Sequence, residues 1–308
     1  MLDQLSYKDK NTFLQNVHTA AILTYLAALL LLPLILAHPL YLLGVFLIGI
    51  LAVVVSDAAQ ECLPFLVMGI WVAVFVMILN PLLVQNGTTV LFYGPELPVI
   101  GRLRITLEAI CYGATMGVRL MAIILAFALY NAIVHPDKVT GLFSRFAWKS
   151  SLVVSLATRM IPSTARDLSN AREVQQMRGV NFSSGGFRER LKKYSWLLEV
   201  LLLSSLEGSL ATAEAMQARG FGSRRRTCYN RELVRPRDYL CFLSGLSALI
   251  IGVYARFAGY ANFSYYPQLD TLAAASDLIW LGVIILCLLL PLILSWGWKH
   301  WPYLRSKI

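Results

Sequence analysis

Long runs of apolar residues, separated by short polar turns, form the main pattern along this 308-residue chain. Each run approaches the ~20 residues with which a helix crosses a bilayer. Prolines within the runs are compatible with such helices, because neighbouring helices can satisfy the freed carbonyls. The pattern therefore predicts six membrane-spanning helices, at about residues 19–37, 40–55, 62–84, 106–134, 239–260 and 277–298.

A connection without a long apolar run separates the third and fourth predicted spans. It covers Gln85 to Arg104 and contains Gly and Pro residues. Within it, Val90–Tyr93 and Leu97–Ile100 are short segments that could pair as a small β-ribbon. We expect this connection on the outer side of the membrane.

The composition agrees with a membrane protein. Hydrophobic residues make up 57% of the chain and charged residues 14%, against roughly a quarter charged in soluble proteins. Between Arg159 and Arg237 lie 15 of the 27 basic residues and seven acidic ones, so this region supplies most of the net charge of +10. Basic residues favour the cytoplasmic side. We therefore expect this region, and both termini, in the cytoplasm.

The fold class expected from these patterns is an all-α integral membrane protein, with about six transmembrane helices and long cytoplasmic helices. Three parts are predicted: an N-terminal four-helix membrane part at residues 1–134, a cytoplasmic helical domain at 135–238, and a C-terminal two-helix membrane part at 239–308. Met1 to Val17 lacks the features of a cleavable signal peptide, so the first span is expected to remain as an anchor.

Motifs for catalysis, cofactor binding and metal binding are not found in the sequence. There is no GxxxxGK[ST] phosphate loop, GxSxG or HExxH, so we expect no ATP hydrolysis and no catalytic residues in this chain. The five cysteines show no CxxC spacing and the four histidines are isolated, so no metal site is expected. The cysteines are interpreted as reduced packing residues, and nucleic acid is not an expected partner.

The basic region contains two long predicted helices that end alike. The first covers Ser151 to Arg178 with a bend at Pro162, and the second covers Phe187 to Arg219. Each runs from an acidic residue through polar residues to Arg-Gly, a sequence typical of a helix C-terminus because Gly adopts the left-handed conformation that closes a helix. The candidate docking residues are Met177, Arg178 and Gly179 at the first end, and Ala218, Arg219 and Gly220 at the second.

A basic residue followed by Gly is also an ordinary helix end in any protein. The second helix carries small residues that would let two helices cross closely, namely Gly208, Ser209, Ala211, Thr212 and Ala215. Such a crossing would bring both Arg-Gly ends into one assembly. The alternative is that these helices are amphipathic and lie on anionic lipid, which the run Arg224–Arg226 also permits.

Arg119 lies within the fourth predicted span, in Gly117-Val118-Arg119-Leu120. An intramembrane Arg is costly, so it must find a partner or reach the interface. Two interpretations remain open at this point: pairing within the helix bundle, or contact with another subunit.

The chain resembles the transmembrane T component of an energy-coupling factor (ECF) transporter, in the family of cobalt-type Q subunits. The resemblance covers roughly Leu26 to Gly222. The segments that carry it are Met177-Arg178-Gly179, Glu214 to Phe221, Arg159-Met160-Ile161-Pro162 and Gly117 to Leu120. Met177 departs from the commoner Ala-Arg-Gly form of the first motif, and the last two spans are less distinctive.

The resemblance implies a non-catalytic scaffold in a prokaryotic inner membrane. Its two cytoplasmic coupling helices would each dock one ATP-binding cassette ATPase through an X-Arg-X motif, here centred on Arg178 and Arg219. A substrate-binding S component would carry the solute, a vitamin or a transition-metal ion such as Co²⁺ or Ni²⁺, and the ATPases would bind ATP. The sequence does not identify the solute, or whether the module serves one S component or several.

Two other functions remain open at the sequence level. A conventional ABC permease would bind its own solute within its spans, and a membrane enzyme acting on lipid would use the basic interface and Arg119. The paired Arg-Gly ends favour the ECF coupling subunit over both.

Overall fold

The computed structural model describes residue 10 and residues 12–84, 87–97, 101–143, 147–182, 184, 186–223, 234–270 and 275–300. The chain forms two compact units. The first combines Met1–Val139 with Glu232–Ile308, so the N-terminal and C-terminal membrane helices pack in one unit, and the second is Thr140–Arg231. The two termini at residues 1–9 and 301–308, the run Arg224–Arg226, and Cys228, which is one of the five cysteines, lie outside the described residues.

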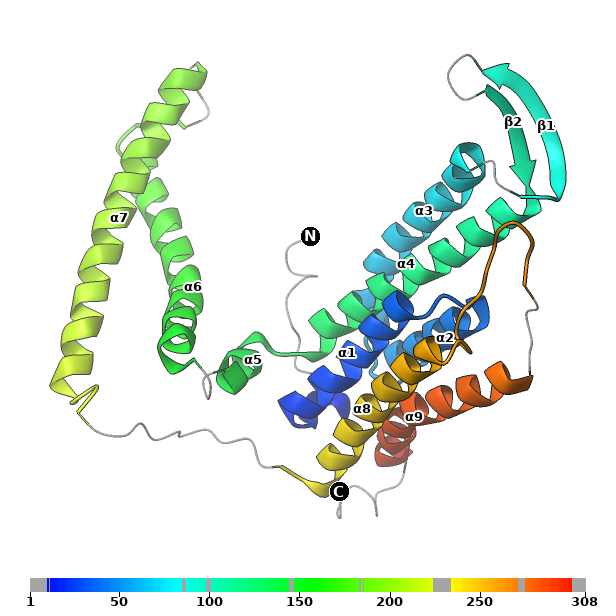
Figure 1. Cartoon of the computed structure of the whole chain (residues 1–308). Helices are drawn as coiled ribbons and strands as arrows, with labels where there is room; N and C mark the ends of the chain where they lie inside the picture. Colours follow the sequence, from blue (N-terminus) through cyan, green and yellow to red (C-terminus); the bar gives the residue numbers. More distant parts are fainter. Residues whose placement is uncertain are drawn as a thin grey trace. The chain divides into compact units, whose positions relative to one another are not determined.

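The first unit is a bundle of helices (Figure 1). Its helices are α1 (Thr19–Ile35), α2 (Pro39–Val55), α3 (Ala59–Leu83), α4 (Leu107–Ile133), α8 (Pro236–Phe257) and α9 (Ala275–His300). The short α5 (Pro136–Phe143) follows α4 and contains the boundary between the two units. Histidines cap the first two helices: Nδ1 of His18 accepts from the Ala20 amide at 3.2 Å, and Nδ1 of His38 accepts from the Leu40 amide at 3.3 Å. The break predicted at His38-Pro39 is thus a helix cap followed by proline at the first helical position.

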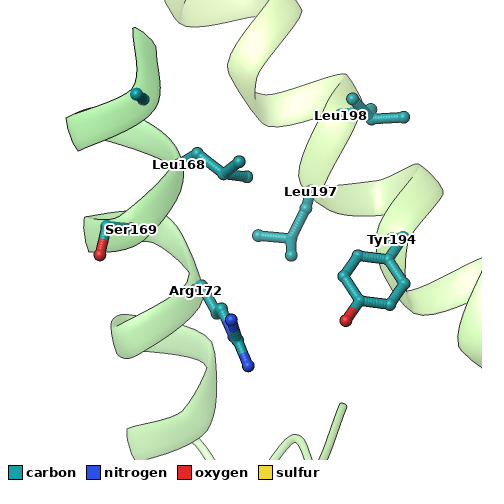
Figure 2. A pocket seen from close by; sticks show the side chains of 7 residues that line it. Leu168, Ser169, Arg172, Tyr194, Leu197 and Leu198 are labelled. Atoms are coloured by element: carbon teal, nitrogen blue, oxygen red, sulfur yellow. The ribbon is translucent and has the colours of Figure 1, made fainter. Parts of the chain in front are cut away.

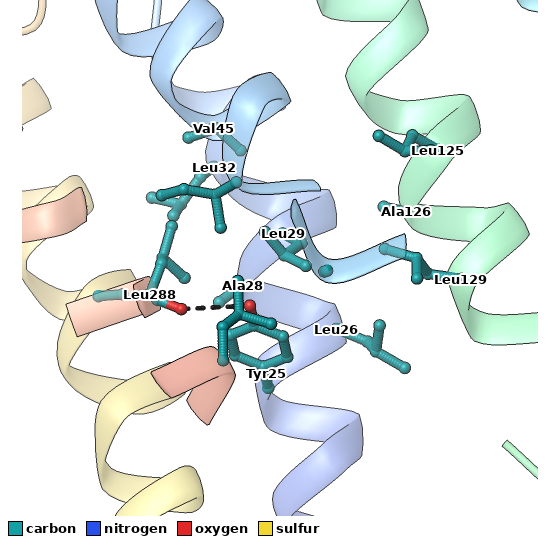
Figure 3. Close-up of a cluster of buried hydrophobic side chains, with 14 of the residues drawn as sticks. Tyr25, Leu26, Ala28, Leu29, Leu32, Val45, Leu125, Ala126, Leu129 and Leu288 are labelled. Carbon is teal, nitrogen blue, oxygen red and sulfur yellow. Dashed lines mark hydrogen bonds between the residues drawn. The ribbon is translucent and has the colours of Figure 1, made fainter. Parts of the chain in front are cut away.

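Helix α1 lies at the centre of the core of the first unit (Figure 3). It packs against α2, α4 and α8. Tyr25, Leu29 and Leu32 are each at most 2% exposed, and Leu129 of α4 is fully buried. The Tyr25 hydroxyl donates to the Leu288 carbonyl of α9 at 3.2 Å, so the buried phenol has a partner and connects α1 to the last helix.

Close backbone approach holds α1 against α8. A Cβ at Gly245 of α8 would lie 3.0 Å from the Tyr25 backbone nitrogen and Cα, which is too close without a shift of one helix. Small residues at such crossings are typical of helices in membranes, where association depends on van der Waals packing. The α1–α8 pair therefore depends on the absence of a side chain at this position.

A two-stranded antiparallel hairpin connects α3 and α4. Its strands are β1 (Val90–Leu97) and β2 (Gly101–Thr106). The first strand contains the predicted segment Val90–Tyr93. The prediction that Leu97 lies in the second strand is wrong, because Leu97 ends β1 and pairs with Gly101, and residues 98–100 of the predicted segment lie outside the described residues. The second strand carries Arg102 and Arg104, so its apolar content is low and did not identify it.

Glu108, in the first turn of α4, fastens the start of this hairpin. Its side chain is buried, at 1% exposure. Oε1 accepts from the amides of Thr88 and Thr89 at 3.2 and 3.0 Å, and from the Thr89 hydroxyl at 2.6 Å. The carboxylate therefore satisfies backbone donors that precede β1, and links the connection to the helix that follows it.

Five helices of the described chain are long and apolar enough to cross a membrane: α3, α4, α7, α8 and α9. Helices α1 and α2 are also apolar but have 17 residues each, at the lower limit for a span. Large apolar side chains of α3 face outward, with Trp71 74% exposed and Met68 67% exposed. The chain is an all-α multi-pass membrane protein, as predicted, and the six predicted spans correspond to α1–α4, α8 and α9.

The second unit consists mainly of two long helices, α6 (Trp148–Met177) and α7 (Phe187–Ala218), drawn in green to yellow-green in Figure 1. Pro162 lies inside α6. The helices contact each other near the turn that joins them, where Leu197 of α7 is 1% exposed and the rings of Phe182 and Tyr194 lie 5.6 Å apart. The Lys193 ammonium donates to the carbonyls of Asn181 and Ser184, which fixes the turn against α7.

Candidate functional site

The two Arg-Gly helix ends have the same backbone structure. Arg178 is the C-cap of α6 with φ −78° and ψ 5°, and Arg219 is the C-cap of α7 with φ −82° and ψ 5°. In each, the amide of the following Gly donates to a glutamine carbonyl three residues back, Gln176 at 3.0 Å and Gln217 at 2.9 Å. The prediction that two helices finish alike is confirmed.

The next residue completes the cap at both ends. The Val180 amide donates to the Gln175 carbonyl at 3.0 Å, and the Phe221 amide donates to the Met216 carbonyl at 3.0 Å. This pair of bonds is the Schellman motif, which satisfies carbonyls that the helix itself leaves without partners. The two ends therefore have the same backbone hydrogen bonds over six positions, residues 175–180 and 216–221.

Glycine is required at both ends by the backbone. Gly179 has φ +88° and Gly220 has φ +73°, in the left-handed region where a side chain costs about 1–2 kcal/mol. A Cβ at Gly179 would meet nothing within 4 Å, so the requirement there is conformational and not one of space. The glycines fix the direction in which the chain leaves each helix, and with it the position of the preceding Arg.

Both arginines are presented outward. Arg178 and Arg219 are exposed, and Met177 beside Arg178 is 88% exposed. Within the described part of the chain, neither guanidinium makes a hydrogen bond or an ion pair that would occupy its donors. Each fork of N–H groups is thus available to bind carboxylates or carbonyls of another molecule bidentately.

The two ends lie at opposite ends of the α6–α7 pair. The helices run antiparallel within the second unit, because a short turn joins them and Leu168 of α6 faces Leu197 of α7 (Figures 1 and 2). Arg178 stands at the turn, and Arg219 stands at the far end of the 32-residue α7, which is about 48 Å long at 1.5 Å per residue. The pair of helices therefore carries one Arg-Gly end at each of its two ends.

The small residues of α7 do not lie where α6 and α7 meet. Each of the five is exposed, and a Cβ at Gly208 would meet nothing within 4 Å. The contact between the helices is made nearer the turn by larger side chains, including Leu197 and Leu201. Close crossing of the two Arg-Gly helices at these small residues stays a prediction, since the described contact between α6 and α7 lies nearer the turn.

Arg119 of α4 has its partner within the bundle. Nη2 donates to the Leu36 carbonyl, at the C-terminal end of α1, at 2.8 Å, and Nη1 lies 3.4 Å from the Met116 sulfur. A cation beside the last carbonyls of a helix is favoured by the helix dipole. Of the two interpretations left open by the sequence, the structure supports pairing within the bundle.

The described residues contain no cluster of side chains suited to bind a metal ion. Across the residues described, no three His, Cys, Asp or Glu side chains lie together so as to hold a metal ion. Cys62, Cys111, Cys241 and Cys287 are free thiols, and Cys62 and Cys241 are buried, which agrees with their interpretation as packing residues.

The sequence analysis did not identify Glu108. Its role is to accept hydrogen bonds from threonines 19 and 20 residues away in the chain, and no local pattern indicates such contacts.

Comparisons with known proteins agree on one family. The family model described as CbiQ, cobalt transport protein, matches residues 10–229, which is more than half of the chain and includes both Arg-Gly ends. The energy-coupling factor transporter transmembrane protein EcfT of Bacillus subtilis is 26% identical over 212 residues, covering 64% of this chain and 76% of that protein.

Two further EcfT proteins show similar likeness. That of Listeria innocua is 28% identical over 190 residues, covering 58% of this chain and 69% of the relative. That of Streptococcus thermophilus is 32% identical over 130 residues, covering 42% of this chain and 49% of the relative. The resemblance stated from the sequence is confirmed, and the chain belongs to the CbiQ cobalt transport protein family, that of the transmembrane T components of energy-coupling factor transporters.

Proposed function

We propose that this chain is the energy-coupling scaffold of an ECF-type importer, with α6 and α7 as its coupling helices. Each helix end docks one ATP-binding cassette ATPase, Arg178 one copy and Arg219 the other. An S component binds the solute, a vitamin or a transition-metal ion, and contacts the membrane helices. The chain itself has no catalytic role, and ATP is bound by the partner subunits.

The observation that carries the proposal is the pair of matching Schellman ends, each with an exposed Arg. A single capped helix end is common, but two ends with the same hydrogen bonds and nearly the same backbone angles present the same group twice. Such a repeat suits a partner that itself has two copies of one binding surface. Nucleotide-driven movement of the two ATPases would then reach both helices together.

The stiffness of the helices supports transmission of movement. The 32-residue α7 moves as a body, because each of its turns is held by backbone hydrogen bonds, whereas α6 lacks one such bond at Pro162. The exposed apolar side chains of the membrane helices, such as Trp71, offer a surface on which an S component can tilt within the bilayer. Movement at the helix ends would thereby change the orientation of the bound S component.

Charge reversal at both ends tests the docking. The double variant Arg178→Glu with Arg219→Glu should abolish co-purification of the ATPases. Loss of a desolvated charge contact costs about 2 kcal/mol or more, so two losses weaken binding roughly a thousandfold. Each single variant should reduce recovery less than the double variant.

A matched control is Arg166→Glu, since Arg166 is an exposed arginine of α6 that donates within its own helix to the Pro162 carbonyl. It should leave co-purification unchanged. Membrane insertion of all variants is followed by their recovery in the membrane fraction. Full recovery of the ATPases with the double variant would refute the proposed docking, and equal loss with Arg166→Glu would show that the effect is one of net charge.

A further inference from the structure

A pocket of about 370 Å³ lies between α6 and α7, away from the Arg-Gly ends (Figure 2). Its volume falls within the range of ~300–1,000 Å³ that small-molecule sites occupy. Leucines 168, 197 and 198 form its apolar side, and Ser169, Arg172 and Tyr194 form its polar side. The proposed docking of ATPases does not use this pocket.

The apolar side of the pocket is only partly covered by the chain. Leu197 is 1% exposed, but Leu168 and Leu198 are 41% and 57% exposed. Leu168 extends from α6 toward Leu197 of α7 in Figure 2. Apolar surface therefore extends from the buried floor of the pocket to its open edge, where a flexible hydrocarbon chain could cover it.

The polar side of the pocket carries a cation. Arg172 extends beside the space between the helices, next to Tyr194 (Figure 2). Within the described part of the chain, its guanidinium makes no hydrogen bond or ion pair. The Tyr194 ring is held by the Phe182 ring at 5.6 Å, which places its hydroxyl on the same side of the pocket as Arg172. These groups favour an anionic, hydrogen-bond-accepting occupant.

The pocket also lies where α7 changes from basic to apolar. Lys192 and Lys193 precede Tyr194 and Trp196, and an apolar run from Leu197 to Leu203 follows, interrupted by Glu199. Basic residues beside aromatic and aliphatic residues are typical of helix segments that lie at a membrane interface. The pocket thus places a cation beside apolar side chains, the two kinds of group that an anionic lipid contacts.

We propose that the α6–α7 pocket binds an anionic phospholipid. Its phosphate accepts hydrogen bonds from the Arg172 guanidinium and from the Tyr194 hydroxyl, and one acyl chain covers the exposed leucine side chains of the pocket. An acidic side chain of a protein partner would match Arg172 but would leave the apolar side uncovered. A phospholipid matches both sides of the pocket.

The experiment uses the full chain in nanodiscs of phosphatidylcholine with a small fraction of phosphatidylglycerol that bears a photoactivatable diazirine on one acyl chain. After irradiation, peptide mass spectrometry locates the labelled residues. Labelling should concentrate in residues 165–172 and 194–198, above the level on the outward face of α3. Unlabelled phosphatidylglycerol should compete, whereas phosphatidylcholine should compete about tenfold less.

Arg172→Gln should lower this labelling about fivefold, as expected for loss of a charge-assisted contact that is partly open to water. The matched control Arg166→Gln removes an exposed arginine of the same helix that does not line the pocket, and should leave labelling unchanged. Leu168→Trp, at the leucine that extends from α6 toward Leu197, should fill the pocket and also reduce labelling. Helical circular dichroism and monodispersity establish that each variant is folded.

Three results would overturn the proposal: labelling no higher in the pocket than on α3, equal competition by phosphatidylcholine, or no effect of Arg172→Gln in a folded protein. A fourth is labelling that occurs in the isolated chain but disappears once partner subunits assemble, since this would assign the pocket to a protein occupant. Recovery of ATPases is measured separately, so failure of lipid binding and failure of docking give different results.

Discussion

Replacing Gly179 with alanine should open the end of α6 without disturbing the rest of the helix. The backbone at this position has φ +88°, and an L-residue with a Cβ pays about 1–2 kcal/mol to adopt it. Nothing lies within 4 Å of the added Cβ, so packing contributes little to the effect. The closed end should therefore lose about 1–2 kcal/mol relative to the open end, and opening should become roughly 5- to 30-fold more frequent.

The same substitution at Gly208 is the matched control. Gly208 lies inside α7, and a Cβ there would also meet nothing within 4 Å. Because its backbone is helical, alanine should stabilise this part of α7 by about 1 kcal/mol. The two Gly→Ala changes are chemically identical and differ only in the backbone conformation, so their effects should have opposite signs.

Hydrogen–deuterium exchange measures both effects. In the native end, the amides of Gly179 and Val180 donate to the carbonyls of Gln176 and Gln175. Gly179→Ala should accelerate exchange in peptides that contain Val180 by the factor given above, and Gly208→Ala should slow exchange around residue 208. Unchanged exchange at Val180 in the folded variant would refute the assignment of Gly179 as a conformational requirement.

Two further predictions concern the first unit. Gly245→Ala should lower the melting temperature in detergent, because its Cβ would press on the Tyr25 backbone and overpacking costs about 1–3 kcal/mol. Gly282→Ala in α9 is the control and should not lower it, because a Cβ there meets nothing within 4 Å. Equal melting temperatures of the two variants would contradict the close approach of α1 and α8. Glu108→Ala should release the start of the hairpin, since three donors of Thr88 and Thr89 lose their acceptor and charged hydrogen bonds contribute about 1.5–3 kcal/mol each. Limited proteolysis between α3 and α4 should be faster in this variant, and less affected in Glu108→Gln, which keeps the acceptor oxygen. Resistance equal to wild type in both variants would show that the hydrogen bonds of Glu108 do not hold the start of the hairpin.

The helix ends were predictable from the sequence because their determinants are local. Arg followed by Gly fixes the end of a helix through the backbone preferences of a few consecutive residues, and the structure ends α6 at Met177 and α7 at Ala218. The membrane helices were predictable for a related reason, since their apolar length is a property of each segment alone. The second strand of the hairpin was missed because it is defined by pairing with β1 and not by its own apolar pattern.

Features that depend on the pairing of distant segments could not be predicted. The pocket between α6 and α7 brings Arg172 beside Tyr194, and no local pattern identifies which face of one helix meets which face of the other. Likewise, the small residues of α7 indicate that a close crossing is possible but not with which helix. Arg119 had a definite need for a partner, but its partner, the Leu36 carbonyl, lies 83 residues away and is visible only in the fold.

The antiparallel arrangement of α6 and α7 has a consequence for symmetry. Two antiparallel helices are exchanged by a two-fold axis perpendicular to them, and this rotation carries one Arg-Gly end onto the other. A single chain can thus present its two Arg-Gly ends with approximate two-fold symmetry. A dimeric partner that repeats one binding surface can then bind both ends. The symmetry is broken beside the arginines, where the highly exposed Met177 corresponds to Ala218. A partner with two different halves could distinguish the two Arg-Gly ends at this position.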